Sequence, residues 1–222
     1  MTGEKSTRVK ETAEQRLERM TSFDAQFCGV VCGVDEAGRG PLVGPVSVCA
    51  CIMPKEPRIL GIDDSKKLSE AKREALYEKI TEIADYCVVF IDRETIDSIN
   101  ILEATKLGMK RAIEGLKSAP DVAIIDAVKN LDVSVKCEPV IKADAKSYSV
   151  AAASIIAKVA RDRFMRELDI KYPMYGFKKN KGYGTKEHID ALKLYGPIDE
   201  HRRSFIKNFV AAESAATTDR DE

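Results

Sequence analysis

The chain has 222 residues, of which 44% are hydrophobic and 32% are charged, and this length is ample for one domain with a buried core. Lys and Arg together number 36, as do Asp and Glu, so the formal net charge is zero. A neutral chain argues weakly against a partner held by overall charge, such as an anionic membrane or bulk nucleic acid.

No segment has the composition of a membrane span or a secretory signal. The longest uncharged apolar run, residues 40–54, has 15 residues and contains Pro41 and Pro45, whereas a spanning helix needs about 20. The first 20 residues are charged throughout. None of the six cysteines forms a CxxC pair and only two histidines are present, which disfavours a zinc site. We therefore expect a cytoplasmic protein with reduced thiols and no membrane association.

The first half of the chain predicts a polar extension followed by strands. Residues 1–27 are polar and charge-balanced, and we expect them to form a weakly ordered or helical extension. Apolar runs at 28–34 and 46–53, joined by a Gly- and Pro-rich turn, predict two antiparallel strands. Ser69 is typical of the N-cap of a helix of about 16 residues, and 86–91 predicts a third strand.

The second half alternates between helices and strands. The predicted elements are a helix capped by Asn100, strands at 122–127 and 133–140, a helix over 147–168 with a buried first half and a partly solvated second half, and a short helix at about 186–195. Strands followed by strand–helix alternation predict the α/β class. The sheet is expected to be mixed, with an antiparallel opening and parallel later strands.

Four acidic residues stand at the ends of these elements. Asp35 and Glu36 follow the first predicted strand, Asp126 ends the strand at 122–127, and Asp144 precedes the long helix. Carboxylates at the carboxyl ends of neighbouring strands converge on one point, and oxygen ligands alone suit Mg²⁺ or Mn²⁺. The alternative is that these are turn-forming residues, which favour strand ends in any case. Glu36 faces the same site as Asp35 only if the strand breaks there, which Gly38 and Gly40 permit.

The sequence GRGPLVG, residues 38–44, is the second signal. Glycines let the backbone approach a ligand closely, and free N–H groups form a site for an anion. The segment matches neither the P-loop nor the dinucleotide-binding pattern. An ordinary strand connection remains the alternative interpretation.

A basic stretch with interleaved aromatics is the third signal. Residues 171–207 contain nine Lys or Arg and four Asp or Glu, a net charge of +5. Tyr175, Phe177 and Tyr183 lie among the lysines. Phosphate-binding cations and stacking rings together indicate a nucleic-acid groove. A solvated helical lobe with a small aromatic cluster is the alternative.

Taken together, these segments resemble the ribonuclease HII family, the type 2 ribonuclease H of bacteria. The segments that carry the resemblance follow the family's order: GVDEAGRGPLVGPV (33–46), DDSKKLS (63–69), SINILEATKLGMKRA (98–112), IDAVKN (125–130), ADAKSYSVAAASIIAKVARDR (143–163), GFKKNKGYGTKEH (176–188) and YGPIDEHRRSF (195–205). The resemblance spans roughly residues 29 to 206 and implies a ribonuclease H-like fold with a mixed central sheet flanked by helices. It divides the chain into an extension (1–27), a catalytic domain (28–170), a small C-terminal helical substrate-binding lobe (171–210) and an acidic tail (211–222).

The resemblance also implies site residues. Asp35, Glu36, Asp126 and Asp144 match the catalytic acids that bind two divalent cations in the family. Gly38, Arg39 and Gly40 match the loop that reads the ribose 2′-OH through its backbone, and Tyr183 matches a tyrosine that stacks on the deoxyribose 3′ of a ribonucleotide. Ser65 and Lys66 match residues near the phosphate backbone, whereas His201 and Arg202 match the terminal motif without an assigned role.

The activity that the resemblance implies is metal-dependent endonucleolytic hydrolysis by a monomer. The substrates would be the RNA strand of RNA–DNA hybrids and duplex DNA with embedded ribonucleotides, nicked 5′ to the ribonucleotide. Two Mg²⁺ or Mn²⁺ ions would leave 5′-phosphate and 3′-hydroxyl ends. The tail shows no sliding-clamp peptide, so no clamp partner is predicted.

Two functions of other classes remain as alternatives. A non-catalytic nucleic-acid-binding module would explain the basic stretch but leave the four acids without a purpose, since carboxylates repel a polyanion. A phosphotransferase using GRGPLVG would lack the lysine of a P-loop.

Overall fold

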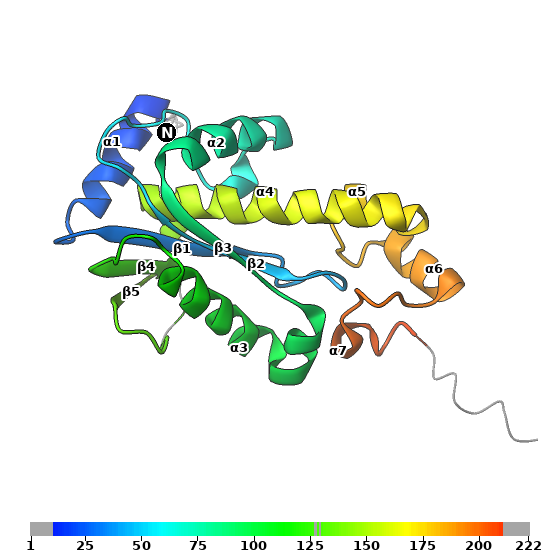
Figure 1. Ribbon diagram of the computed structural model, residues 1–222. Helices are drawn as coiled ribbons and strands as arrows, with labels where there is room; N and C mark the ends of the chain where they lie inside the picture. Colours follow the sequence, from blue (N-terminus) through cyan, green and yellow to red (C-terminus); the bar gives the residue numbers. More distant parts are fainter. Residues whose placement is uncertain (1–10, 127, 129, 211–222) are drawn as a thin grey trace, which may run out of the picture.

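A five-stranded mixed sheet forms the centre of the computed structural model, which describes residues 11–126, 128 and 130–210 (Figure 1). The strands are β1 (Val31–Ala37), β2 (Val46–Ile52), β3 (Asp85–Ile91), β4 (Val122–Asp126) and β5 (Lys136–Val140), and their order in the sheet is β3-β2-β1-β4-β5. β1, β2 and β3 pair antiparallel, whereas β4 pairs parallel to both β1 and β5. The predicted mixed sheet with an antiparallel opening is therefore confirmed.

Helices cover both faces of the sheet. In Figure 1, α4 (Tyr148–Lys171), α1 (Ala13–Asp24) and α2 (Glu70–Ile83) lie above the sheet, and α3 (Arg93–Glu114) lies below it. The backbone of α4 lies directly on β1, because a Cβ atom added at Gly33 would come within 2.1 Å of the Val150 nitrogen. Only glycine allows this approach. Small residues such as Ala151, Ala152 and Ala153, all fully buried, let the rest of the helix follow.

The alternation of side chains along the strands produces two cores. Cys49 and Cys51 of β2 join Ile155 and Ile156 of α4 in the core above the sheet. Val46, Val48 and Ala50 join Met109 and Ala112 of α3 in the core below it. The six cysteines are all free thiols, and Cys32, Cys49 and Cys51 are buried, as expected for small apolar residues. No helix in the described part of the chain combines the length and apolarity needed to cross a bilayer.

The C-terminal lobe gathers at the far end of α4 (Figure 1). Its helices are α5 (Phe177–Asn180), α6 (Lys186–Tyr195) and α7 (Arg203–Ile206), and short 3₁₀ turns occur at Ser65–Lys67, Ala143–Ala145 and Pro173–Tyr175. Tyr175 and Phe177 pack with Val43 and Met165 in one apolar cluster. The lobe therefore shares its core with the loop after β1 and with α4. The predicted tail, 211–222, and residues 1–10 of the predicted extension lie outside the described residues.

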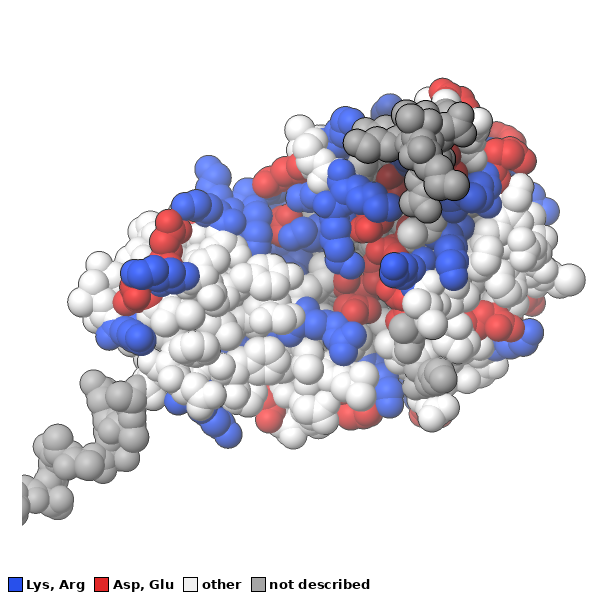
Figure 2. All heavy atoms as spheres, turned by 180° about the vertical axis from the view of Figure 1, so that it is seen from behind, with Lys and Arg blue, Asp and Glu red and all other residues white. Residues whose placement is uncertain are grey.

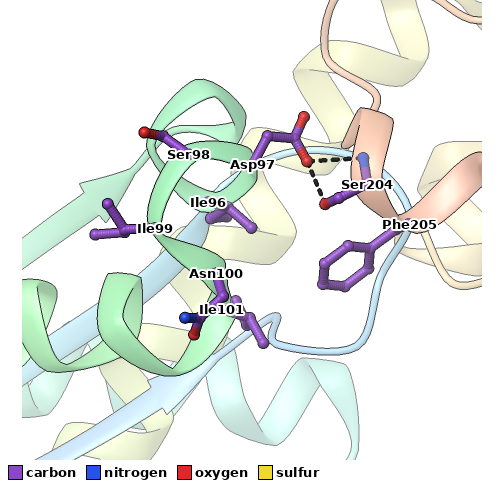
Figure 3. Close-up of a pocket in the computed structure, with 8 residues that line it drawn as sticks. All are labelled: Ile96, Asp97, Ser98, Ile99, Asn100, Ile101, Ser204 and Phe205. Atoms are coloured by element: carbon purple, nitrogen blue, oxygen red, sulfur yellow. Dashed lines mark hydrogen bonds between the residues drawn. The ribbon is translucent and has the colours of Figure 1, made fainter.

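The first turn of α3 fastens the lobe to the lower layer. The carboxylate of Asp97 accepts hydrogen bonds from the backbone nitrogens of Arg203 (2.7 Å) and Ser204 (2.9 Å), and from the Ser204 hydroxyl. Figure 3 shows this contact beside a pocket of about 420 Å³ lined by Ile96, Asp97, Ser98, Ile99, Asn100, Ile101, Ser204 and Phe205. None of these lining residues belongs to the predicted site.

Several element boundaries differ from the sequence prediction. β1 runs from Val31 to Ala37 rather than over 28–34, because Asp35, Glu36 and Ala37 pair with Cys49, Val48 and Ser47 of β2. The strand predicted at 133–140 begins only at Lys136. The caps at Ser69 and Asn100 are confirmed, since each side chain accepts hydrogen bonds from the first turn of its helix. An additional helical turn precedes Asn100, whose positive φ of 68° marks the kink.

Within the predicted N-terminal extension, α1 packs firmly on the body of the protein. Met20 is fully buried in the core above the sheet, and Asp24 accepts hydrogen bonds from the nitrogen and the hydroxyl of Ser149, each at 2.9 Å. Burial raises the pKa of Asp24, although its hydrogen bonds with Ser147 and Ser149 oppose the shift. These contacts fix α1 to the start of α4.

We expect Met20→Ala to lower the free energy of unfolding by about 2–5 kcal/mol, because it removes a buried side chain and leaves a cavity. Urea unfolding followed by circular dichroism measures the loss. Met174→Ala, at a methionine that is 48% exposed, is the control and should change stability by less than about 0.5 kcal/mol. Equal stability of the two variants would show that α1 does not contribute to the core.

Candidate active site

Three of the predicted acids lie at one edge of the sheet, on the side covered by α4. The last residue pair between the parallel strands β1 and β4 is Val34 with Ile125, so Asp35 and Asp126 occupy the next position on each strand. Both follow residues that face α3, and strand alternation therefore turns them toward α4. Asp144 lies in the 3₁₀ turn immediately before α4. Asp35 and Asp144 are only 8% and 6% exposed.

Glu36 reaches this edge differently from the prediction. The strand does not break between Asp35 and Glu36, because pairing with β2 continues through Ala37, so the two side chains leave the strand on opposite faces. Glu36 Oε1 pairs with Arg39 at 3.4 Å, while the buried Oε2 has no hydrogen-bond partner among the described residues. Burial raises the pKa of Glu36; Arg39 opposes the shift and Asp126 adds to it. The negative charge of Asp126 therefore contributes to the raised pKa of Glu36.

Burial and repulsion between neighbouring acids both raise the pKa values of Asp35 and Asp144. Burial, followed by the charge of Glu36 and then those of Asp144 and Asp126, raises the pKa of Asp35 well above its usual value, against a hydrogen bond from the Glu36 backbone. Burial and Asp64 raise the pKa of Asp144, with Lys66 opposing. Figure 2 shows acidic side chains gathered in the middle of one face with Lys and Arg around them. Such a cluster gains stability from any cation that enters it.

The donor set fits a hard divalent cation. It consists of carboxylate oxygens, and one of them, Glu36 Oε2, is buried with no hydrogen-bond partner in the part of the chain that the structure describes. Nevertheless, no three His, Cys, Asp or Glu side chains within the described ranges come close enough to form a finished ligand group. Asp126 Oδ1 instead accepts hydrogen bonds from the backbone nitrogens of Lys142 (2.9 Å) and Ala143 (3.4 Å). The acids thus share one region of negative charge without forming a closed cage.

The Gly38–Arg39–Gly40 loop is held from behind by Arg202. Its guanidinium donates hydrogen bonds to the carbonyl oxygens of Gly38 (2.7 Å), Arg39 (2.8 Å) and Gly44 (2.9 Å). In a planar trans peptide the N–H points away from the preceding carbonyl, so the N–H groups of Arg39 and Gly40 face away from Arg202. Arg39 and Gly40 are exposed. The loop therefore offers two outward N–H groups to a ligand.

Arg161 of α4 fixes the remainder of the same loop. It donates to the carbonyl oxygens of Pro45 (3.1 Å), Val43 (3.2 Å) and Lys181 (2.9 Å). Gly38, at a φ of +96°, lies against this guanidinium, since an added Cβ would come within 2.0 Å of Arg161 Nε. Burial lowers the pKa of Arg161 to about 10 and that of Arg202 to about 9. Both side chains stay charged at neutral pH.

Tyr183 lies exposed beside Gly40 of this loop, whereas the other two predicted aromatics are buried beneath it. Tyr183 is 47% exposed, and its ring would be 3.6 Å from a Cβ added at Gly40. A backbone hydrogen bond of 2.8 Å from Leu42 to Gly182 joins the two segments. Tyr175 and Phe177 are buried and stack on each other at 5.2 Å, so the prediction that they are stacking rings for nucleic acid is wrong.

The DSKK segment brings a cation to the acids. Lys66 Nζ lies 3.9 Å from Asp144 Oδ2, and the Lys66 side chain is 81% exposed. Burial acts to lower the pKa of Lys66, but Asp144, Asp35 and other nearby acids together produce a net rise. Ser65 is buried within the turn and only 6% exposed. Lys66 therefore lies at the exposed margin of the acidic region, whereas the preceding Ser65 is buried.

Sequence reasoning missed the inward role of both buried arginines and of the histidines. Arg161 lies in the part of the long helix predicted to be partly solvated, yet it is 1% exposed, and Arg202 is fully buried. His188 and His201 are also fully buried, with their Nε2 atoms 3.1 Å apart. The one available signal was the HRRSF segment, which the resemblance matched without explaining.

The histidine pair should make stability depend on pH. Burial lowers the pKa of His188, and burial together with His188 lowers the pKa of His201 to about 4. An unfolded histidine takes up a proton near pH 6.5, whereas folded His201 does so only near pH 4, so the unfolded state binds more protons between these values. Stability therefore falls as the pH drops through this window, by up to about 1.4 kcal/mol per pH unit for His201, and the lowered pKa of His188 acts in the same direction.

We expect the free energy of unfolding in urea to fall less between pH 7 and pH 5 in His201→Gln than in the unsubstituted protein. The carboxylates are common to both proteins, so the difference reports the histidine. An equal loss of stability in both would mean that the His201 ring is not held neutral in the folded state.

Comparisons with known proteins agree with this geometry. The family model for Ribonuclease HII matches residues 32–208. The ribonuclease HII of Acetivibrio thermocellus is 53% identical over 182 residues, covering 82% of this chain and 71% of the relative. That of Macrococcus caseolyticus is 46% identical over 222 residues, covering 96% and 84%.

Solved structures share the fold. The ribonuclease H2 of Pyrococcus horikoshii matches with a TM-score of 0.69 at 29% identity, covering 81% of this chain and 96% of that one. The ribonuclease HII of Archaeoglobus fulgidus, solved in complex with PCNA, matches with the same TM-score at 30% identity and the same coverage. The matched segment includes the β1 acids, the loop after them, Tyr183 and both buried arginines, so this chain belongs to the ribonuclease HII family of endonucleolytic hydrolases, which act on the RNA strand of RNA–DNA hybrids.

Proposed function

We propose that this protein nicks duplex DNA on the 5′ side of embedded ribonucleotides and cleaves the RNA strand of hybrids, leaving 5′-phosphate and 3′-hydroxyl ends. The observation that supports the proposal is that a cluster of acids lies next to a surface of hydrogen-bond donors. The buried Asp35 and the half-buried Asp126, at the ends of β1 and β4, lie next to a loop with outward N–H groups, and the exposed ring of Tyr183 lies beside that loop. A binding module has no use for the acids, and the loop lacks the lysine with which a P-loop holds a nucleoside triphosphate.

In this proposal, Asp35, Glu36, Asp126 and Asp144 hold two divalent cations, Mg²⁺ or Mn²⁺. When bound, the cations supply an activated water and stabilise the leaving 3′-oxygen. The chain itself contributes the position of the carboxylates. Asp126 is oriented by the backbone nitrogens of Lys142 and Ala143, and Asp35 is fixed within the paired part of β1. Lys66, 3.9 Å from Asp144, is placed to contact a phosphate beside the acids.

Recognition of RNA is assigned to the loop and to Tyr183. The 2′-OH distinguishes RNA from DNA, and a backbone N–H of Arg39 or Gly40 can donate to it without a side chain that crowds the sugar. Gly40 lies next to the Tyr183 ring, since an added Cβ would be in van der Waals contact with it at 3.6 Å. An exposed ring at this place can stack on the next sugar along the strand. The archaeal relative's PCNA partner is not proposed for this chain, because its tail shows no clamp peptide.

The first test uses a DNA duplex with one ribonucleotide. We expect nicking 5′ to the ribonucleotide with Mg²⁺ or Mn²⁺, and none after a chelator is added. Binding without nicking would support the non-catalytic module. Inertness until a nucleotide is supplied would support the phosphotransferase.

We expect Asp126→Asn to lower the rate of metal-dependent cleavage by about 100-fold or more, since losing a ligand or its orientation disables such sites. The Asn carbonyl can still accept from Lys142 and Ala143, so the fold should survive, which thermal unfolding checks. Asp132→Asn, whose side chain is 96% exposed, is the control and should keep full activity. Near-normal cleavage by Asp126→Asn would contradict the site assignment.

Tyr183→Ala should lower kcat/KM for the single-ribonucleotide duplex by about 5- to 100-fold, the effect of losing one stacking contact, whereas Tyr183→Phe should stay close to normal. Steady-state cleavage of that duplex provides the measurement. Tyr195→Ala is the control, because Tyr195 is similarly exposed (56%) but lies at the end of α6. If Tyr195→Ala lost as much activity as Tyr183→Ala, the ring of Tyr183 would have no special role.

A further inference from the structure

The dipeptide His201–Arg202 connects the two proposed substrate-reading elements. On one side, the Arg202 guanidinium binds the carbonyls of Gly38 and Arg39. On the other side, His201 contacts His188, whose Nδ1 lies 3.0 Å from the carbonyl oxygen of Tyr183. Adjacent residues of the chain thus connect to the loop proposed to read the ribose and, through His188, to the backbone of the residue that carries the exposed ring.

The hydrogen bonds of this connection can be satisfied in only one direction. The backbone N–H of Ile198 donates to His201 Nδ1 at 3.0 Å, so that nitrogen carries no proton. A neutral His201 then carries its proton on Nε2 and donates it to His188 Nε2, 3.1 Å away. His188 must therefore carry its own proton on Nδ1 and donate to Tyr183. Each link fixes the tautomer of the next.

Neither histidine is available to a substrate. Both are fully buried, and the rings of Tyr175 and Phe177 pack edge-on against His188 at centroid distances of 6.2 and 5.2 Å. Arg202 is also fully buried, and its donors are used on carbonyls. These three residues can affect cleavage only through the elements that they hold.

The separation between the loop and the ring matters because they would read neighbouring sugars of one strand. If either element moved alone, the ribose and the next deoxyribose could not be engaged together, and even a shift of about 1 Å in a positioning group is costly. Further backbone hydrogen bonds, Leu42 to Gly182 (2.8 Å) and Arg202 to Leu42 (2.9 Å), join the same three segments.

We propose that His188, His201 and Arg202 are positioning residues that fix the Tyr183 ring relative to the Gly38–Arg39–Gly40 loop, and that this spacing sets the preference for a ribonucleotide followed by a deoxyribonucleotide over continuous RNA. The inference rests on the proposed function and adds a determinant of substrate class to it. Arg202 acts on the loop, and the histidine pair acts on the ring.

The test compares two substitutions of His201 that differ in which hydrogen bond they keep. Gln places its amide near the Nε2 position and can still donate to His188. Asn places its carbonyl near the Nδ1 position and keeps only the bond from Ile198. Both lose the imidazole ring, so a purely structural role predicts similar effects. The readout is the ratio of kcat/KM on the single-ribonucleotide duplex to kcat/KM on a continuous RNA–DNA hybrid, with thermal unfolding measured for each variant.

We expect His201→Asn to lower this ratio about 5- to 50-fold, toward the value of Tyr183→Ala, and His201→Gln to stay within about threefold of the unsubstituted enzyme. In a His201→Asn/Tyr183→Ala double variant the ratio should fall no further than in Tyr183→Ala alone, because the histidine acts through the ring. Equal ratios in the Asn and Gln variants, or additive losses in the double variant, would overturn the proposal.

Arg202→Lys tests the loop side without altering the histidines. Lysine cannot reach three carbonyls at once, so kcat/KM should fall on both substrates, each of which carries the 2′-OH. Arg203→Lys, at a neighbouring side chain that is 47% exposed, is the matched control and should match the unsubstituted enzyme. Normal activity of Arg202→Lys on both substrates would overturn the role of Arg202. If the unsubstituted protein cleaves neither substrate, the proposed function itself fails and this inference fails with it.

Discussion

Two buried guanidiniums that bind backbone carbonyls are the constraint on which the site depends. Removing a cation from water is costly, and an arginine is kept in such a place only where its donors are satisfied. Arg161 and Arg202 together donate hydrogen bonds to six carbonyl oxygens. Five of these belong to residues 38–45 after β1, and the sixth is that of Lys181, before Tyr183. Because the carbonyls turn inward, the N–H groups of Arg39 and Gly40 must turn outward. The surface proposed to read the ribose is thus the opposite side of a loop whose carbonyls bind buried guanidiniums.

In the acidic region the charges are negative, and they repel one another. Asp35 and Asp144 are nearly buried, and burial together with the neighbouring acids raises the pKa of each. The paired part of β1, the backbone bonds to Asp126 and the turn before α4 hold the acids near one another despite this repulsion. The rigid secondary structure therefore offsets the electrostatic repulsion between these carboxylates. In the proposed function, the same rigidity keeps these carboxylates in one region, where divalent ions would bind.

The sequence predicted most of the local structure and the identity of the acids, but not how they are held. The caps at Ser69 and Asn100 depend on a few neighbouring residues, and so they could be read directly. The continuation of β1 through Glu36 depends on pairing with β2, which local signals such as Gly38 do not reveal. Charged residues in a helix are usually solvated, so the burial of Arg161 was not visible. Among Tyr175, Phe177 and Tyr183, only the packing of the lobe decides which ring faces out.

Part of the positive charge of the basic 171–207 stretch is engaged within the protein. Two of its cations are engaged in ways that its net charge does not count: Arg202 is buried against backbone carbonyls, and Lys181 pairs at 3.5 Å with Glu70 of α2, outside the stretch. The stretch therefore offers less positive charge to phosphates than its +5 suggests. Phosphate contacts dominate affinity for nucleic acids, so attraction should be weak and local, and the acids would oppose it further until cations neutralise them. In the proposed function, selectivity then comes chiefly from short-range contacts with the sugars, so the fixed geometry of the loop and of Tyr183 carries more weight than the overall charge.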